Sequence, residues 1–349
     1  FGRFDWGEES APVHPRTTIY DLASLTKVVA TTTAIMILYD RGKVRLDDPV
    51  SKYLPSFTGG EKGRVTIRHL LAHHSGLPSG RDVWRTARSA AEARRQVLAT
   101  PLVAAPGRKQ LYSDLGPDIL GFVVEAVSGE TLDVFLDRRV FRPLRMRSTS
   151  FRPAPRMRAR TAPTEPAPPR GYPLRGEVHD ENAFALGGVA GHAGLFSTAA
   201  DLSIFAQMML NGGVYNGIRI ASDSAVALFT SRAAGSRALG WEICEGAGAC
   251  GHNLGAGAYG HTGFTGTSLW IDPEREMFVI LLTNWVHMDP HSVNDPFAVL
   301  PDVRADVADV AALAVMDHPF GVAPMPEQFR SDRALGWGLP RPGFRLPGA

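Results

Sequence analysis

The sequence predicts an α+β fold in which the strands of the main sheet come from the two ends of the chain. Residues 1–20 contain a strand-then-turn pattern, Phe4-Asp-Trp-Gly7. Residues from about 21 to 235 contain apolar runs at helical spacing, whereas residues from about 236 to 318 contain short apolar runs separated by turn residues. A mostly helical region between strands distant in sequence indicates an α+β architecture with a helical subdomain.

The first predicted helix follows the N-terminal strand. It contains Ser24 and Lys27 and continues through an apolar run, Val28 to Tyr39. Asp21 is a suitable N-cap, and Gly42 suits the position just after the helix C-terminus. The helix would span about 20 residues, or roughly 30 Å. Because it is apolar nearly all round, we expect it to be buried.

Periodicity and capping residues predict the rest of the helical region. The expected helices are, in order, Ile67–His73, Arg81–Thr100, Gly116–Val127, Thr131–Val140, Asp201–Leu210 and Ser222–Arg232. A basic, proline-rich stretch from Arg152 to Pro173 interrupts them, and we interpret it as a surface loop.

The C-terminal part is predicted to form an antiparallel meander and a closing helix. The expected strands are Leu239–Ile243, His261–Gly263, Thr267–Ile271 and Met277–Thr283, and the expected helix is Ala305–Met316. We expect one domain over residues 1–318. Residues 319–349 are rich in proline, glycine and arginine, so we expect a loosely attached tail.

The composition is that of an ordinary globular protein, with 44% hydrophobic and 21% charged residues. The net charge of +2 does not favour nucleic acid as a partner. No apolar run reaches the roughly 20 residues that a membrane-spanning helix needs. The chain begins with Phe rather than Met, so the lack of a visible signal peptide says nothing about export.

Three further patterns do not indicate a metal or a cofactor, and we expect neither. Cys244 and Cys250 either form a small hairpin disulfide in an oxidising compartment or remain two thiols. His69 and His73 have chelating spacing, but no H-E-x-x-H motif or third ligand accompanies them. Residues 246–251 and 255–260 match G-x-G-x-x-G outside any βαβ unit.

Ser24 and Lys27 form an S-x-x-K motif with a chemical rationale. Residues three apart on a helix share a face, so Ser24 Oγ and Lys27 Nζ can touch. A serine hydroxyl is a weak nucleophile until a base removes its proton. Lysine is such a base only when neutral, and burial can lower its pKa by roughly 3–5 units. We therefore expect the buried helix to lower the pKa of Lys27, although two fixed residues alone do not establish catalysis.

Two more stretches have the composition of an active site. Tyr112, in Tyr112-Ser-Asp114, is either a phenolate or proton relay beside a cation, or a half-buried aromatic at a helix start. In Gly260-His-Thr-Gly263 the glycines let a substrate lie along a strand, and the backbone N–H of Phe264 can donate to an oxyanion. The alternative for this second stretch is a strand with a glycine bulge.

The order S-x-x-K, Tyr112-Ser-Asp114, His261-Thr-Gly263 resembles the serine β-lactamase and penicillin-binding-protein superfamily. The nearest branch contains class C β-lactamases, esterases, D-aminopeptidases and D-Ala-D-Ala carboxypeptidases. The resemblance runs from about residue 1 to about 316, and it implies that the N-terminal helix and first strand of the family are missing ahead of Phe1. Further matching segments are Leu70–Leu77, Pro143–Met146, Val178–Ala183 and Gly187–Ser197.

This resemblance implies a β-lactamase/transpeptidase-like fold with the active site between the sheet and the helical subdomain. Ser24 would be the acylated nucleophile, Lys27 would take or share its proton, and Tyr112 would be the general base that later protonates the leaving group. The backbone N–H groups of Ser24 and Phe264 would form the oxyanion hole. The substrate pocket would be lined by His261, Thr262 and Gly263.

Two departures from the family pattern bear on the substrate. Asp114 replaces the usual Asn, and its charge either lies beside the nucleophile or pairs with Lys27. His261 replaces a Lys that commonly binds a β-lactam carboxylate, and a neutral imidazole attracts that carboxylate less. Both changes favour an esterase or D-amino-acid peptidase over a β-lactamase.

The expected substrate is a small ester, amide, β-lactam or D-amino-acid peptide. The resemblance favours a periplasmic or secreted location, and the sequence does not predict an oligomeric state. Two rival functions remain, a penicillin-recognising sensor that acylates without turnover and a histidine-bound metal hydrolase.

Overall fold

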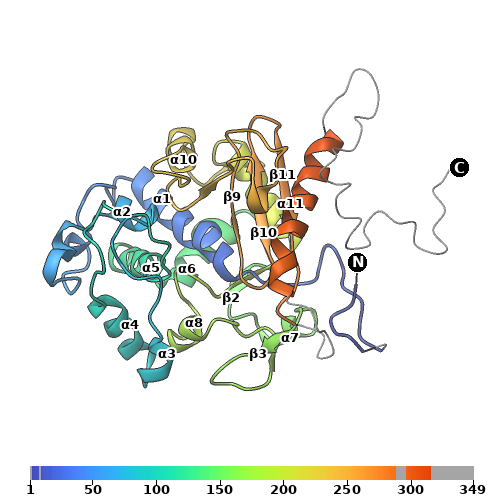
Figure 1. Cartoon of the computed structure of the whole chain (residues 1–349), viewed down its shortest axis with the longest axis horizontal. Helices are drawn as coiled ribbons and strands as arrows, with labels where there is room; N and C mark the ends of the chain where they lie inside the picture. Colours follow the sequence, from blue (N-terminus) through green and yellow to red (C-terminus); the bar gives the residue numbers. More distant parts are fainter. Residues whose placement is uncertain (1, 8, 288–295, 316–349) are drawn as a thin grey trace, which may run out of the picture.

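The computed structural model describes residues 2–7, 9–287 and 296–315 of the chain. Helices and antiparallel strands share one large core, as the α+β prediction requires (Figure 1). The helices are α1 Thr33–Asp40, α2 Ile67–Leu71, α3 Val83–Thr86, α4 Ala90–Ala99, α5 Leu115–Ser128, α6 Leu132–Leu136, α7 Pro155–Arg158, α8 Glu181–Ala185, α9 Ala199–Leu210, α10 Asp223–Thr230 and α11 Pro296–Val315.

The strands fall into a main sheet and smaller pairings. They are β1 Tyr20–Asp21, β2 Ser150–Phe151, β3 Thr164–Pro166, β4 Pro173–Leu174, β5 Leu195–Ser197, β6 Val214–Tyr215, β7 Ile218–Arg219, β8 Glu242–Ile243, β9 Tyr259–Thr262, β10 Ser268–Asp272 and β11 Met277–Leu281. The main sheet has the antiparallel order β11-β10-β9-β8, so the predicted C-terminal meander is confirmed.

Strand β10 is buried on both of its faces. All five of its residues are buried, and successive side chains of a strand point to opposite faces. Leu269 and Ile271 join the large core, whereas Trp270 packs in a second cluster with Ala308 and Ala312 of α11. Helices therefore cover both faces, with α9 and α11 each contacting β11.

The first helix is continuous with the turn that carries the S-x-x-K motif. A 3-10 turn over Ala23–Leu25 leads into a π-helical stretch, Lys27–Thr32, and then into α1. Its apolar residues are buried as predicted, and Gly42 adopts a φ of +65° just after the helix, as expected for a C′ glycine. The predicted N-cap is wrong, because Asp21 lies in β1, although its Oδ1 accepts the N–H of Ala23 at 2.9 Å.

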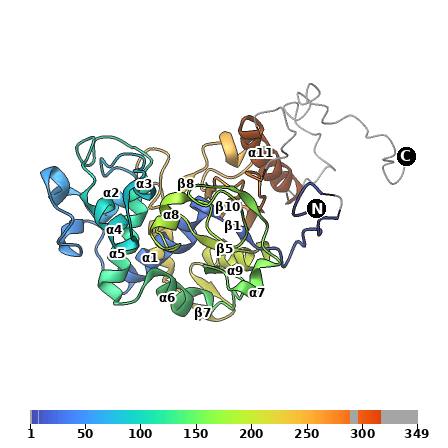
Figure 2. The ribbon, with the colours of Figure 1, turned by 90° about the horizontal axis from the view of Figure 1, so that it is seen from below.

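The expected strand within residues 1–20 does not join the main sheet. Phe4 N–H instead donates to the carbonyl of Ala11 at 3.0 Å. The N-terminal segment therefore pairs with residues a few positions further along the same chain, and not with a strand of the main sheet. Strand β1, which follows, belongs to a separate three-stranded sheet of order β1-β5-β2. Figure 2 shows β1 and β5 side by side, and Asp21 is paired there with Phe196.

Two other predictions about the helical region are wrong. The segment Arg152–Pro173 is not simply a surface loop, because Ile19 pairs with its backbone at Arg160 and Ala162, and these contacts bury Ala162. The predicted helix Arg81–Thr100 is broken into α3 and α4, because the Ser89 side chain accepts the N–H of Glu92 and begins a new helix. The other predicted helices are present within a few residues of the expected bounds, except that α11 begins earlier, at Pro296.

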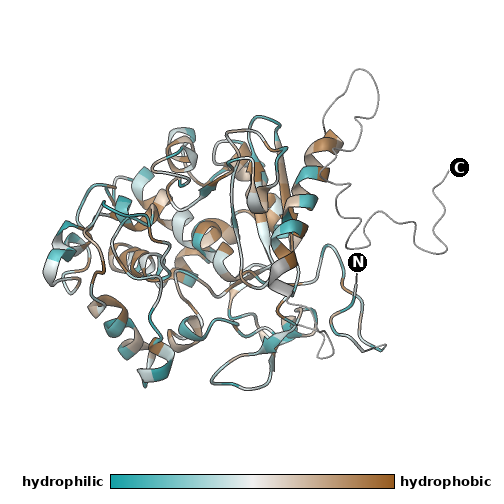
Figure 3. Ribbon diagram, viewed as in Figure 1, coloured by the Kyte–Doolittle hydropathy of each residue, from teal (hydrophilic) through white to brown (hydrophobic). Residues whose placement is uncertain are grey.

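Figure 3 shows hydrophobic residues along the sheet strands and central helices, and hydrophilic residues on the outer turns. Among the described residues, no helix combines the length and apolar character needed to cross a bilayer. The predicted tail, residues 319–349, lies outside the described residues.

Candidate active site

Ser24 and Lys27 meet at the start of the first helix. Lys27 Nζ donates to Ser24 Oγ at 2.7 Å, so the contact predicted from their spacing is confirmed. Ala23, directly before the serine, has a φ of +45°, a left-handed conformation that is uncommon for a residue with a Cβ. Strand β1 and this strained residue together set where Ser24 Oγ points.

Tyr112 reaches the same point from the loop before α5. Its neighbours fix that loop, since Leu111 N–H donates to the His73 carbonyl at 2.8 Å and Ser113 N–H donates to His73 Nδ1 at 3.2 Å. Tyr112 Oη lies 3.2 Å from Ser24 Oγ. The serine oxygen therefore lies between an ammonium group and a phenol.

Lys27 is a buried cation in this arrangement. Its Nζ lies 2.8 Å from Asp114 Oδ1 and also donates to the His192 carbonyl at 3.3 Å. Burial opposes the charge, but the adjacent Tyr112 and Asp114 outweigh it and raise the pKa of Lys27 above its usual value. The prediction that burial would lower this pKa is therefore wrong, whereas the alternative in which Asp114 pairs with Lys27 is confirmed.

His261 and Gly263 form the opposite wall, along β9. His261 Nδ1 lies 2.7 Å from the Thr262 carbonyl, which can only accept, so this nitrogen carries the proton. Burial and the cations of Arg237 and Lys27 hold the pKa of His261 well below its usual value. The ring is therefore neutral, as expected from its replacement of a lysine.

The turn after β9 is held against the start of the first helix. Thr265 Oγ1 donates to the Asp21 carbonyl at 2.7 Å, and Thr267 Oγ1 donates to the Leu22 carbonyl at 3.1 Å. A Cβ added at Gly263 would lie 2.2 Å from Thr267 Oγ1 and 2.5 Å from the Leu22 oxygen, so only glycine fits. This close approach brings Phe264 to the pocket that Ser24 lines.

A pocket of about 480 Å³ opens at Ser24. Among the predicted site residues, its lining includes Ser24, Tyr112, His261, Thr262, Gly263 and Phe264. Lys27 and Asp114 do not line it; Lys27 is buried, whereas the side chain of Asp114 is 37% exposed. The structure thus brings together all eight predicted residues, six that line the pocket and two that form an ion pair beside Ser24.

Sequence reasoning missed three charged residues of this pocket, Arg237, Glu242 and Arg304. Arg304, on α11, donates to the carbonyls of Gly263 at 2.6 Å and Thr267 at 3.1 Å, and burial lowers its pKa to about 10. It therefore supports the turn after β9 from behind. No motif marks these residues, because each is a single charged residue whose position depends on the fold.

A buried charge network lies beneath Lys27. His192 Nδ1 lies 2.7 Å from Asp118 Oδ1, and its Nε2 lies 2.9 Å from Asp180 Oδ1. Burial opposes a charge on His192, but the two carboxylates outweigh it and raise the pKa of His192 well above its usual value. His192 is thus an imidazolium that donates two hydrogen bonds.

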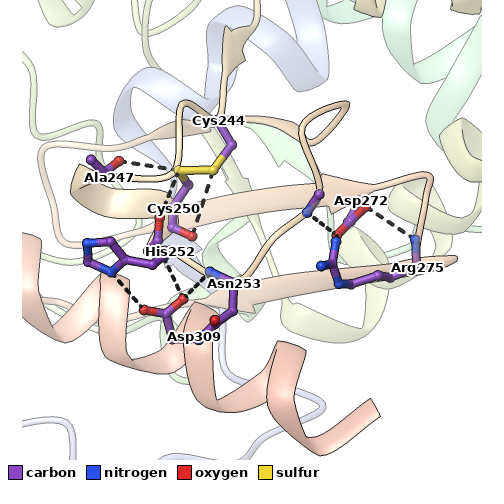
Figure 4. The surroundings of a disulfide bond; sticks show 10 residues. Cys244, Ala247, Cys250, His252, Asn253, Asp272, Arg275 and Asp309 are labelled. Carbon is purple, nitrogen blue, oxygen red and sulfur yellow. Dashed lines mark hydrogen bonds and ion pairs between the residues drawn. A yellow bond between two sulfur atoms is a disulfide. The ribbon is translucent and has the colours of Figure 1, made fainter. Parts of the chain in front are cut away.

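The structure also places the two cysteines and most of the glycine-rich segments of the sequence in one loop. Cys244 and Cys250 form a disulfide in the loop between β8 and β9, which decides between the two open alternatives. Figure 4 shows this loop docked on α11, where Asp309 accepts the backbone N–H groups of His252 at 2.6 Å and Asn253 at 2.7 Å. The antiparallel strands on either side leave no βαβ unit for a dinucleotide.

His69, in α2, and His73, just after it, have backbone partners. His69 Nδ1 accepts the N–H of Thr66 at 3.3 Å, and His73 Nδ1 accepts that of Ser113. Within the described ranges, no group of three or more His, Cys, Asp or Glu side chains is arranged to hold a metal.

Comparison with known proteins agrees with this geometry. Residues 4–302 match the model of the beta-lactamase family, so the chain belongs to that family. It is a serine hydrolase of the serine β-lactamase and penicillin-binding-protein superfamily, acting on ester or amide substrates.

Individual relatives carry related names. The chain is 37% identical over 313 residues to an Escherichia coli (strain K12) protein provisionally named D-alanyl-D-alanine carboxypeptidase, covering 80% of this chain and 71% of that protein. A penicillin-binding protein homologue from Caulobacter crescentus shares the fold with a TM-score of 0.70 at 20% identity, covering 89% and 88% of the two chains. A family VIII carboxylesterase does so with a TM-score of 0.66 at 20% identity, covering 87% of each.

Proposed function

We propose that Ser24 is the nucleophile of an ester or amide hydrolase that works through an acyl-enzyme. The observation that carries this proposal is the position of Ser24 Oγ, 2.7 Å from Lys27 Nζ and 3.2 Å from Tyr112 Oη, at the wall of the pocket. These distances are short enough for a proton to leave Ser24 Oγ and for the negative charge that then forms on Oγ to be stabilised.

Tyr112 acts as the general base and takes the proton of Ser24 while Oγ forms a bond to the substrate carbonyl carbon. The carbonyl π electrons move to oxygen, and the backbone N–H groups of Ser24 and Phe264 stabilise that oxyanion. When the carbon–leaving-group bond breaks, Tyr112 returns the proton to the leaving alcohol or amine. A water molecule then attacks the acyl-enzyme by the same route, and Ser24 recovers its proton.

Lys27 remains an ammonium group throughout this cycle. The Asp114 carboxylate keeps it charged, so it acts by donating to Ser24 Oγ and by favouring negative charge on that oxygen and on Tyr112. This role replaces the one expected from the sequence, in which Lys27 takes the proton of Ser24.

The substrate class that we favour is a small ester or a D-amino-acid peptide. The names of the E. coli relative and of the carboxylesterase support this choice. The neutral His261 supplies no cation for a β-lactam carboxylate, so we expect β-lactams to react more slowly than esters.

Intact-mass measurement tests the nucleophile. The chain should gain one adduct with a fluorophosphonate, and Ser24→Ala should gain none. Ser113→Ala is a matched control, because Ser113 is buried and donates to the Pro78 carbonyl at 2.6 Å. An adduct that survives in Ser24→Ala would exclude the assignment.

A turnover screen then separates the substrate classes. Short acyl esters, a chromogenic β-lactam and peptides ending in D-Ala-D-Ala should be compared at equal concentration. Steady ester or peptide turnover supports the proposal, whereas a single β-lactam burst without turnover of any substrate would indicate a sensor.

A further inference from the structure

Phe264, whose backbone N–H is the second proposed oxyanion donor, lies in a tight turn over residues 263–267. Gly263 N–H donates to the Thr267 carbonyl at 2.8 Å, and Gly266 N–H donates to the Gly263 carbonyl at 3.0 Å. These two hydrogen bonds close the turn, but they do not fix where the turn lies relative to Ser24. The position of the oxyanion donor therefore depends on what holds the turn from outside.

The turn is held both at the start of the first helix and at α11. Thr265 and Thr267 donate to carbonyls two and three residues before Ser24, as described above. From α11, Arg304 Nη2 donates to the carbonyls at both ends of the turn, that of Gly263 at 2.6 Å and that of Thr267 at 3.1 Å. Arg304 therefore connects the turn to an element that carries none of the proposed catalytic groups.

Arg304 is a buried cation whose partners are mainly these two carbonyls. The residue is 9% exposed, and its Nε is buried without a hydrogen-bond partner among the described residues. Burying a guanidinium costs free energy unless its N–H groups find acceptors. The guanidinium and the turn are therefore coupled, because neither can shift without losing charge-assisted hydrogen bonds.

The disulfide loop between β8 and β9 fixes the part of α11 that carries Arg304. Residues four apart on a helix share a face, so Arg304 lies on the same face of α11 as Ala308 and Ala312. These alanines pack in one cluster with both cysteines of the disulfide. Asp309 accepts two backbone N–H groups of the same loop (Figure 4). A stretch of α11 about 7.5 Å long, from Arg304 to Asp309, thus connects the disulfide loop to the oxyanion turn.

We propose that Arg304 is a positioning residue that sets the place of the Phe264 N–H in the oxyanion hole, and that the disulfide loop acts on catalysis through it by fixing α11. This inference rests on the proposed function, in which Phe264 stabilises the oxyanion. Arg304 lines the pocket but acts through the turn, so it needs no contact with the substrate. Reduction of the disulfide should therefore lower turnover although neither sulfur atom takes part in the reaction.

Arg304→Met tests the positioning role, because methionine has a similar length and lacks the donors. The turn keeps its own backbone hydrogen bonds in this variant, so we expect it to fold. Loss of one oxyanion donor costs about 100–1000-fold in rate, and displacement of a donor that is still present should cost less, about 10–100-fold. The kcat/KM for p-nitrophenyl acetate, a neutral ester, should fall by that smaller factor, and Arg304→Lys should restore part of the loss.

The affinity for phenylboronic acid measures the oxyanion hole itself. Ser24 Oγ adds to boron, its proton passes to the general base, and one oxygen of the tetrahedral boronate occupies the oxyanion hole. In Arg304→Met this affinity should fall by the same factor as kcat/KM, because both depend on the tetrahedral geometry. Arg232→Gln is the control, because Arg232 pairs with Glu245 at 2.8 Å and does not line the pocket of Ser24.

Both quantities should be expressed per site that reacts with the fluorophosphonate, which removes misfolded protein from the comparison. Unchanged kcat/KM and boronate affinity per reactive site would show that Arg304 is only structural and would overturn the inference. A loss confined to a peptide ending in D-Ala-D-Ala, with the neutral ester unaffected, would overturn it in favour of direct binding of the substrate carboxylate.

The disulfide provides an independent test of the route through α11. Replacing Cys244 and Cys250 by serine should lower both quantities about two- to tenfold in the unmodified chain and should add nothing in Arg304→Met. Additive losses would exclude this route. If Arg304→Met does not fold, Arg304→Lys and the serine variant decide, and an unchanged boronate affinity in both would refute the inference. An unmodified chain that neither hydrolyses esters or peptides nor reacts with the fluorophosphonate would instead refute the proposed function.

Discussion

His192 provides the most demanding test of the electrostatics, because it places a cation in the core between two carboxylates. His192 and Asp118 are both 2% exposed and lie 2.7 Å apart, whereas Asp180 is 30% exposed. Removing one partner of a buried ion pair costs about 3–5 kcal/mol, because the other charge is left uncompensated. We expect His192→Gln to lower the free energy of unfolding by that amount near pH 6.

The sign of the pH dependence follows from the raised pKa of His192. Its stabilising contribution is complete below the unfolded-state pKa of about 6.5 and is lost as the pH rises through the folded-state value. Between these two values, the difference between the unmodified protein and His192→Gln should shrink by about 1.4 kcal/mol per pH unit.

Urea unfolding at a series of pH values measures both quantities. The matched control is His179→Gln, because His179 Nε2 also lies 2.9 Å from a carboxylate, that of Glu165, which is 36% exposed. Because Glu165 is partly exposed, water screens that pair, and His179→Gln should cost less stability than His192→Gln. A loss below about 1 kcal/mol for His192→Gln, or a loss that does not change between pH 6.5 and 9, would refute the reasoning.

Two further changes have definite expected outcomes. Gly263→Ala places a Cβ 2.5 Å from the Leu22 carbonyl, so the turn before Phe264 must move. We expect a loss of about 1–3 kcal/mol in stability and at least about tenfold in kcat/KM, checked against Gly63→Ala, where the Cβ would meet nothing within 4 Å; equal kinetics in the two variants would contradict this. Replacing Cys244 and Cys250 by serine should lower the free energy of unfolding by about 2 kcal/mol, because the disulfide closes a loop of six residues. Urea unfolding with and without reductant measures it, and an unchanged midpoint in the variant would show that the bond does not stabilise the fold.

The parts of the site that the sequence predicts correctly are those fixed by local geometry or by motif order. Ser24 and Lys27 touch because residues three apart share a helix face. Tyr112 lies 88 residues from Ser24 in sequence, so only the motif could place it there. His261, a departure from the family pattern, lies opposite them and is neutral.

The parts that could not be predicted depend on partners from distant segments. The pKa of Lys27 rises rather than falls because Asp114 and Tyr112 approach it from another element. Arg237 has no local signal, since only the fold brings its guanidinium within 5.4 Å of the centre of the Tyr112 ring. The strand expected near Phe4 does not join the main sheet, because its backbone N–H donates to the carbonyl of Ala11. A short alternation of apolar and polar residues does not show which partner a segment will pair with.

The threonine contacts that hold the turn after β9 against the start of the first helix also determine when the enzyme can become active. Thr267 and Leu22, which they join, are 245 residues apart in sequence, and Lys27 and His192 are 165 apart. Such contacts can form only after both segments have been synthesised, and closing them costs loop-closure entropy. A partly synthesised or partly folded chain would therefore contain Ser24 without Tyr112 beside it and without the turn after β9 that carries Phe264. Hydrolysis would begin only once nearly the whole domain is in place, which keeps a reactive nucleophile silent during synthesis.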